Sequence, residues 1–313
     1  MKVLVTGAAG FIGSNIVKLL ESKGAKTIIF DNFSHSSYKN LDGTKGDVIC
    51  ADILDAAIYK KLPKVDAIIH EAAITDTTLL DDTKMMMVNF EGFKNVFNYS
   101  LKKKIKLVYA SSAGVYGNGR SPMSETQEAA PHNTYAYSKY LCDVHSEKVS
   151  KVVKTPLVVG VRYFNVYGPN EYHKGSAASM TYQLYLQMKN GKRPRVFKHG
   201  EQKRDFIYVK DVARITVEAL NLKKNAILNV GTGTAGSFNE IIAALNKSLN
   251  KNLKPDYFDN PYADVYQDFT QADIGLLKKL GIAPEFDLRS GIKDYVINYL
   301  EKEIQPKADS AKC

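Results

Sequence analysis

The feature that most constrains this chain is a glycine-rich turn close to its amino terminus. Gly7, Gly10 and Gly13 are spaced G-x-x-G-x-x-G, after an apolar run at Lys2–Thr6 and before a segment, Phe11–Glu21, whose apolar residues recur at helical spacing. Between a strand and a helix, the first glycine permits a tight turn, the second lets the backbone approach a pyrophosphate, and the third allows close packing. The N–H groups and the dipole at a helix amino terminus favour phosphate. The turn therefore predicts a dinucleotide-binding site.

Apolar runs and helical stretches alternate over the first 160 residues. Further strands are expected at 26–31, 47–51, 66–70, 106–111 and 157–161. Helices are expected between them, at 83–101 and 135–152. Near-continuous apolar strands separated by helices indicate a parallel sheet covered on both faces. Right-handed crossovers then give a Rossmann-type, doubly wound α/β fold.

The alternation loosens after residue 162, where Tyr, Asn, Gly and Ser become frequent. We predict an NAD(P)-binding Rossmann domain over residues 1–165, which also receives roughly 205–235. A smaller α/β substrate-binding domain is predicted from 166–204 and 236–304, and a flexible tail from 305–313.

The charge balance bears on possible partners. Lys and Arg number 43 against 33 Asp and Glu, a net charge of +10, while 44% of residues are hydrophobic, as in soluble globular proteins. The basic residues are scattered, which favours a small polyanionic ligand over a nucleic acid. No apolar run approaches the ~18 residues that span a bilayer, so no membrane partner is expected. Three isolated cysteines fit a reducing compartment, and we expect a cytoplasmic location.

Two carboxylates follow the second and third expected strands. Asp31 lies 18 residues beyond Gly13, where a carboxylate binds the ribose of NAD and repels the 2′-phosphate of NADP. The stretch from Asn32 to Lys39 holds side chains that could instead cradle that phosphate, so the choice between NAD and NADP stays open. Asp52 is placed to meet the adenine, or to cap a helix.

A tyrosine and a lysine at the start of a predicted helix indicate the chemistry. Tyr135 and Lys139 are four residues apart and therefore share one helix face. A nearby ammonium and a positive nicotinamide favour the phenolate form, so Tyr135 can act as a general acid or base. The pair Ser111-Ser112 closes the fifth strand, and we assign Ser112 to the oxygen of the reacting group.

These residues carry a resemblance. The glycine triplet, Ser112, Tyr135 with Lys139, Asn89 and the block 162–169 (RYFNVYGP) resemble the extended short-chain dehydrogenase/reductase family, which includes nucleotide-sugar epimerases, dehydratases and reductases. The likeness covers nearly the whole chain. Within that family, the segments HEAA (70–73), TDTT (75–78), HKGSAAS (173–179), KRDF (203–206) and FTQAD (269–273) resemble the ADP-glyceromanno-heptose 6-epimerases.

The narrower resemblance implies a reaction. The enzyme would invert C6″ of an ADP-D-glycero-manno-heptose by transient oxidation and reduction with a tightly bound NAD(P)+, and so supply the heptose precursor of lipopolysaccharide core. Lys174 would be a second catalytic base, facing Tyr135 across the sugar. The resemblance further implies NADP preference, a small-molecule ADP-sugar as partner and a homo-oligomer. No metal is expected, because a dinucleotide carries the hydride chemistry.

The resemblance and the residue patterns together give two sets of site residues. The predicted cofactor residues are Gly7, Gly10, Phe11, Ile12, Gly13, Asp31, Asn32, Asp52, Glu71, Ala72, Ala73, Thr75, Asn89, Lys139, Val166 and Lys174. The predicted substrate residues are Ser112, Asn165, Ser176, Gln183, Phe197, Gly200, Arg204 and Tyr266.

Alternative functions would require other residues or leave these without a role. Another nucleotide-sugar epimerase, such as a UDP-glucose 4-epimerase, would lack the sequence around Lys174. A dehydratase would need an Asp–Glu pair after Ser112, where Ala113-Gly114 stand. A non-catalytic dinucleotide sensor or RNA-binding protein would leave Tyr135 and its partners without use. Lys174 could also be a phosphate-contacting or surface lysine.

Overall fold

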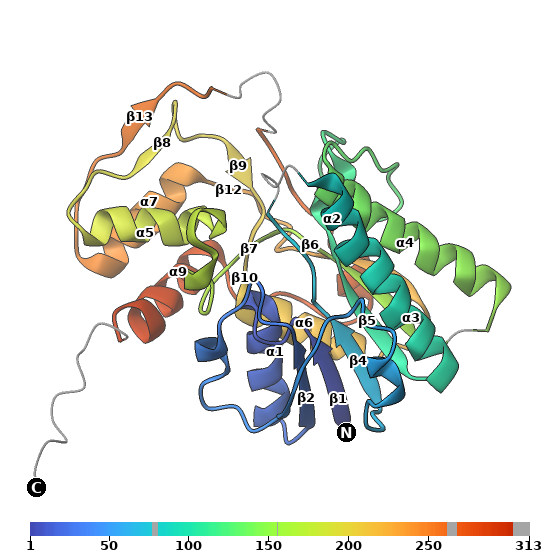
Figure 1. Ribbon diagram of the computed structural model, residues 1–313. Helices are drawn as coiled ribbons and strands as arrows, with labels where there is room; N and C mark the ends of the chain where they lie inside the picture. The colour runs from blue at the N-terminus through green and yellow to red at the C-terminus, as the bar shows by residue number, and fades with distance from the viewer. Residues whose placement is uncertain (77–80, 155, 262–267, 303–313) are drawn as a thin grey trace, which may run out of the picture.

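A seven-stranded parallel sheet forms the centre of the computed structural model, which describes residues 1–76, 81–154, 156–261 and 268–302 (Figure 1). The strand order is β11-β6-β5-β4-β1-β2-β3, and every neighbouring pair is parallel. The strands are β1 (Lys2–Thr6), β2 (Lys26–Asp31), β3 (Asp47–Cys50), β4 (Ala67–His70), β5 (Lys106–Ser112), β6 (Val158–Tyr163) and β11 (Ala226–Val230). The predicted doubly wound α/β fold is confirmed.

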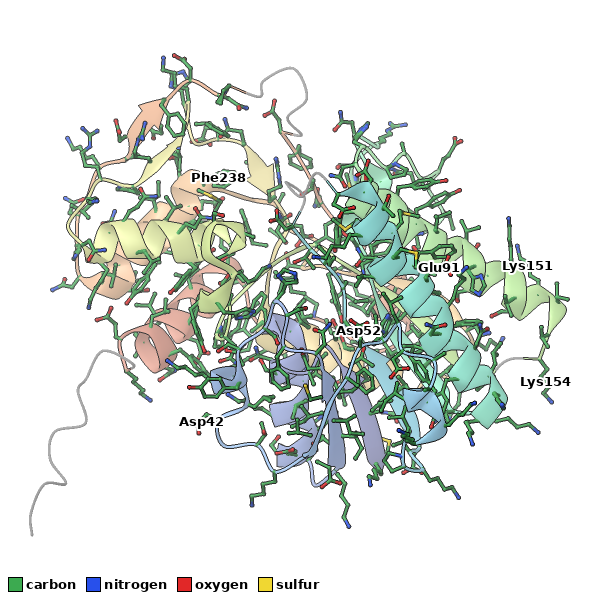
Figure 2. All side chains as sticks on the ribbon, in the orientation of Figure 1. Asp42, Asp52, Glu91, Lys151, Lys154 and Phe238 are labelled. Carbon is green, nitrogen blue, oxygen red and sulfur yellow. The ribbon has the colours of Figure 1, made fainter. Side chains whose placement is uncertain are left out.

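Helices cover both faces of the sheet. In β1, Val3 and Val5 pack with α1 (Phe11–Ser22) and α6 (Val209–Ala219), whereas Leu4 between them packs with α3 (Gly92–Lys103) on the other face. The period of two along a strand produces this division. Helix α4 (Thr134–Val152) lies beside α3, and its far end points away from the sheet into solvent (Figures 1 and 2).

The segment expected to form one helix over 83–101 is divided into three parts. Helix α2 (Asp82–Met86) leads into a π-helical turn at Met87–Glu91, and α3 follows. Such turns are frequent at functional sites, because the extra residue re-aims the side chains of the helix. Here the turn carries Asn89, which is fully buried.

A second, smaller unit lies above the carboxyl ends of the strands (Figure 1). Its core is built from three helices, α5 (Met180–Lys189), α7 (Phe238–Leu249) and α9 (Leu288–Tyr295). Figure 2 labels Phe238 at the start of α7. The remaining elements are β7 (Asn165–Tyr167) paired with β10 (Phe206–Tyr208), β8 (Arg195–Phe197) with β13 (Asp256–Phe258), β9 (Lys203–Arg204) with β12 (Gly236–Ser237), α8 (Gly275–Lys279), the π-helical turn Val296–Leu300, and 3-10 turns at Tyr38–Leu41, Ile58–Lys60, Ala113–Tyr116 and Tyr172–Ala177.

The chain crosses between the two units more than once. It leaves the sheet after β6, contributes α5 to the second unit, and returns through α6 to β11 at the edge of the sheet. The domain limits stay a prediction. The paired strands β7 and β10 lie beside the boundaries expected at residues 165–166 and 204–205. The expected tail at 305–313 lies outside the described residues. Within the described ranges, no helix is long and apolar enough to cross a membrane.

Candidate active site

The glycine turn joins β1 to α1 in a form that admits a dinucleotide. Gly7 has φ +64°, and a Cβ there would lie 2.6 Å from the backbone nitrogen of Ala72. A Cβ at Gly13 would overlap the carbonyl oxygen of Gly7. Gly10 caps α1 with no side-chain hydrogen bond, so no side chain occupies the helix amino terminus. At Gly7 and Gly13 the backbone therefore lies too close to its neighbours for a side chain, and the open amino terminus of α1 suits a pyrophosphate.

A pocket of about 520 Å³ opens beside this turn. It gathers most of the predicted cofactor residues, namely Gly7, Gly10, Phe11, Ile12, Gly13, Asp31, Asn32, Asp52, Glu71, Ala72, Ala73, Thr75, Lys139 and Lys174. Tyr135, the predicted acid or base, lines the same pocket. Residues from β1 to the turn after β7 therefore converge on one space. Sequence reasoning did not single out Lys84, Tyr163 or His173, which also line it.

Two predicted cofactor residues do not line the pocket. Asn89 uses its side-chain amide to accept from the backbone N–H of Ile74 at 2.8 Å and to donate to the Ile74 carbonyl at 3.0 Å. It also donates to the hydroxyl of Ser138 at 3.1 Å. Asn89 thus holds the pocket wall, since Ile74 is a lining residue. Val166 lies in β7, opposite Ile207 of β10.

Asp31 and Asp52, which were predicted to meet the ribose and the adenine of a dinucleotide, accept hydrogen bonds from residues of the surrounding loops. Asp31 is buried and accepts hydrogen bonds from the backbone N–H groups of Ala9 at 2.9 Å and Phe33 at 2.8 Å, and from the Ser36 hydroxyl at 2.9 Å. Asp52, labelled near the centre of Figure 2, accepts from the Asn32 side chain at 2.9 Å. Both carboxylates line the pocket, so they can also meet a ligand.

Tyr135 and Lys139 stand one turn apart at the start of α4. Asn133 caps this helix by accepting from the Ala136 N–H at 2.8 Å. Lys139 is only 3% exposed, donates to the carbonyl of Ala110 at 3.0 Å, and lies 6.0 Å from the centre of the Tyr135 ring. The phenol of Tyr135 and the buried ammonium of Lys139 thus stand together in the pocket, an arrangement that suits an acid–base residue and its partner.

The two serines that end β5 have different partners. The Ser111 hydroxyl donates to the buried carboxylate of Asp143 at 3.0 Å, whereas the Ser112 hydroxyl accepts from the backbone N–H of Gly114 at 3.1 Å. Ser111 lines the pocket, and Ser112 does not. The assignment of Ser112 to the reacting oxygen stays a prediction, supported by the commitment of the Ser111 hydroxyl to Asp143.

Asp143 belongs to a buried network that sequence reasoning missed. Arg162 donates to it through Nε at 2.9 Å, and Tyr109 donates through its hydroxyl at 3.0 Å. Burial raises the pKa of Asp143, while Arg162 opposes the rise. The network joins β5, β6 and α4, and so fixes the helix that carries Tyr135. Its members are far apart in sequence, and no local motif marks them.

Lys174 reaches the pocket from the 3-10 turn Tyr172–Ala177. The fully buried carboxylate of Glu171 anchors this turn by accepting from the N–H groups of Gly168 at 3.0 Å and Ser179 at 2.6 Å. Burial lowers the pKa of Lys174, and Glu171 acts in the opposite direction. The Lys174 ammonium lies 5.6 Å from the centre of the Phe11 ring, over the start of α1. Because burial disfavours the charged form, a lysine of this kind is neutral, and so able to accept a proton, more often than an exposed one.

His70 ends β4 beside the turn. Its Nδ1 atom lies 2.7 Å from the hydroxyl of Thr6, and the ring is 2% exposed. Burial, with a smaller contribution from Lys139, lowers the pKa of His70 to about 3, so the ring is neutral. Among the described residues, no three His, Cys, Asp or Glu side chains gather in a way that could hold a metal ion.

Of the predicted substrate residues that the structure describes, Ser112 ends β5 and the others lie in or near the second unit, and none of them is among the residues lining the 520 Å³ pocket. Gln183 donates to the carbonyls of Ser176 at 2.8 Å and Ala178 at 2.9 Å. Arg204 is 8% exposed and donates to the Lys203 carbonyl at 2.9 Å. The others are Asn165 in β7, Phe197 in β8, Gly200 with φ +75°, and Tyr266, which lies outside the described residues.

The glycine turn, the Tyr135–Lys139 pair and the shared pocket define a class of dinucleotide-dependent enzyme. The chain belongs to the NAD dependent epimerase/dehydratase family, whose pattern matches residues 3–231. It is 42% identical to an ADP-L-glycero-D-manno-heptose-6-epimerase of Brachyspira hyodysenteriae, over 96% of this chain and 98% of that one.

Solved structures extend this comparison. The ADP-L-glycero-D-manno-heptose-6-epimerase of Helicobacter pylori is 39% identical with a TM-score of 0.87, covering 94% of this chain and 95% of that one. The UDP-glucose 4-epimerase of Thermotoga maritima is 27% identical with a TM-score of 0.89, covering 97% and 100%. The two folds fit this chain equally well, so sequence identity, rather than the fold, distinguishes the two relatives.

Proposed function

We propose that this protein is an ADP-heptose 6-epimerase, which inverts C6″ of ADP-D-glycero-manno-heptose to the L-glycero form. The observation that carries the proposal is that Lys174 and Tyr135, from separate elements, line one pocket with the glycine turn. Inversion at a carbon that bears a hydroxyl requires proton transfer at two positions of the oxygen. Two acid–base groups on different elements can meet both positions.

The residues of this chain divide the work. When bound, the dinucleotide supplies the acceptor and donor of a hydride. One of Tyr135 and Lys174 takes the proton from the C6″ hydroxyl, and the other returns a proton after the ketone has turned about the C5″–C6″ bond. Lys139 supports the Tyr135 phenolate, and Ser112 donates to the reacting oxygen. Arg204 meets the diphosphate, for which a planar, permanently charged group is suited.

For the cofactor, we propose NAD rather than NADP. The support is the carboxylate of Asp31 in the pocket, which repels a 2′-phosphate. From the described loop between β2 and β3, His35 is the one basic residue that lines this pocket, while Lys39 lines a separate cavity. Mass analysis of the nucleotide released by denaturing the purified protein tests this choice, and NADP as the released species would contradict it.

The activity is tested by incubation with ADP-D-glycero-manno-heptose and separation of the two 6″ epimers by chromatography or NMR. We expect an equilibrium mixture of epimers from the wild-type protein. Tyr135→Phe removes the phenolic proton and lowers turnover by ~10²–10⁴-fold. Tyr137→Phe, two residues along α4 and half exposed, is the matched control and should retain turnover. Turnover of UDP-galactose with none of the heptose would overturn the proposal.

A further inference from the structure

The carboxylate of Glu71 ends a short chain of hydrogen bonds that begins in α6. Tyr163 donates to Glu71 Oε1 at 2.8 Å, and the Tyr163 hydroxyl lies 2.8 Å from that of Thr216. Thr216 in turn donates to the carbonyl of Val212 at 2.7 Å. Glu71 and Tyr163 both line the cofactor pocket. The mechanism above uses neither of them.

Counting protons shows which charge on Glu71 this chain of contacts favours. With Glu71 ionised, the two hydroxyl protons serve Glu71 and Val212, and the 2.8 Å contact between the Tyr163 and Thr216 oxygens holds no proton. With Glu71 protonated, three protons fill three contacts, running from Glu71 through Tyr163 and Thr216 to Val212. The fully hydrogen-bonded arrangement therefore includes a proton on Glu71, and ionisation removes one hydrogen bond from the chain.

Glu71 lies at the reactive end of the pocket. The charge of Lys139 acts on Glu71, and that of Tyr135 acts on Tyr163, the direct partner of Glu71. Asp31 and Asp52, by contrast, follow β2 and β3 at the other end. The proposed function assigns Tyr135 and Lys139 to the reacting oxygen and the nicotinamide ribose, and Glu71 lines the same pocket, so a bound nicotinamide would lie beside Glu71.

We propose that the charge of Glu71 sets the preference of the site for oxidised over reduced cofactor. The oxidised nicotinamide carries a positive charge and the reduced ring carries none, so a carboxylate in a largely buried pocket stabilises the oxidised form selectively. The ammonium of Lys139 has the opposite effect, and Glu71 compensates for it. Of the other groups around Glu71, Tyr163 and His70 are neutral at physiological pH, because burial raises the pKa of Tyr163 and lowers that of His70.

The preference should depend on pH near neutrality. Burial raises the pKa of Glu71 to about 7, against the lowering effects of Tyr163 and Lys139. As the pH falls through this value, Glu71 gains a proton, the oxidised cofactor loses its selective stabilisation, and reduction becomes easier. By linkage, oxidised cofactor lowers the pKa of Glu71 when it binds.

A redox titration of the holoprotein tests the inference without any sugar. The midpoint potential of the bound cofactor is measured by its near-ultraviolet absorbance and compared with that of free dinucleotide at the same pH. This difference reports the ratio of the affinities for the two forms. For Glu71→Gln at about pH 8, we expect the ratio to shift about tenfold towards reduced cofactor, a potential higher by about 30 mV. At about pH 6 the variant and the wild-type protein should converge.

Two further variants make the outcome decisive. Asp42→Asn, an exposed carboxylate outside this pocket, is the charge-matched control and should leave the ratio unchanged. Tyr163→Phe removes a donor to the carboxylate and should move the pH midpoint of the wild-type curve upward, which keeps the inference testable if Glu71→Gln binds no cofactor. An unchanged ratio in Glu71→Gln, or an unmoved midpoint in Tyr163→Phe, would overturn it. The inference presupposes the dinucleotide chemistry of the proposed function, but a failure of heptose turnover would leave this ratio intact, so the two failures are distinguishable.

Discussion

The cofactor side and the substrate side of this site are built in different ways. On the cofactor side, one turn between β1 and α1 and the ends of neighbouring parallel strands supply nearly every predicted residue to one pocket. On the substrate side, the predicted residues that the structure describes come from the end of β5, from β7, β8, β9 and α5, and from the turns and loops beside them, and none lines that pocket.

The difference follows from what each side must recognise. A pyrophosphate is bound by backbone N–H groups, so a short run of glycines in a regular β-turn-α unit is sufficient. A particular sugar is selected by side chains, which must be brought together from distant parts of the chain. Three substitutions test this difference between the cofactor side and the substrate side.

The largest effect is expected from Gly7→Ala on the cofactor side. The added Cβ would lie 2.6 Å from the Ala72 nitrogen, at a φ of +64° that alanine rarely adopts. The displaced turn should lose affinity for the dinucleotide by more than about 1,000-fold, which corresponds to more than about 4 kcal/mol. Calorimetric titration with NAD measures this loss. Gly24→Ala is the control, because its φ of +78° brings comparable strain with no atom within 4 Å, and it should bind NAD normally.

A smaller loss, confined to turnover, is expected from Lys174→Met. Turnover of the heptose should fall by ~10²–10³-fold, because one of two proton-transfer groups is gone. NAD affinity should change by less than about tenfold, since the glycine turn is intact. Lys39→Met, outside this pocket, controls for the loss of a positive charge. Retention of near wild-type turnover by Lys174→Met would show that it is not an acid–base group.

The smallest effect is expected where the two sides are joined. The Asn15 side chain of α1 donates to the Pro169 carbonyl at 2.9 Å, beside the turn that carries Lys174. Asn15→Ala should lower the free energy of unfolding by about 1 kcal/mol, and the melting temperature by ~2–4 °C. Asn190→Ala is matched, because both side chains donate to the carbonyl four residues earlier but only Asn15 crosses to another segment. Equal melting temperatures for the two variants would contradict a role in joining the sides.

The sequence predicted the sheet well because its signals are local. Most of the strands, which are 4–7 residues long, are apolar runs, and their predicted boundaries differ from the observed ones by at most two residues. The helix expected over 83–101 was wrong as a single element. Its π-helical turn arises from the packing of Asn89 against Ile74, a contact that no helical periodicity contains.

The candidate site was predictable only where the spacing of residues within a motif determines how they are placed in space. The glycine turn and the Tyr135–Lys139 spacing are of this kind. Glu171 was not foreseen as the anchor of the Lys174 turn, because a buried carboxylate that binds backbone N–H groups has no distinctive sequence neighbourhood. Nor could the sequence show that Asp143 and Arg162 meet, 19 residues apart, on facing elements.

The position of β11 has a consequence for how the molecule is made. Strand β6 pairs with β5 on one side and with β11 on the other, and β11 ends at residue 230. A nascent chain emerging from the ribosome therefore presents the open edge of β6 until the residues of β11 have been synthesised. A chain that ends prematurely between β6 and β11 retains the glycine turn and the Tyr135–Lys139 pair. Its unpaired β6 edge can pair with a strand from another chain, so the fragment is prone to aggregation. Quality control in the cell would have to recognise that fragment by its edge, because its nucleotide pocket would be almost finished.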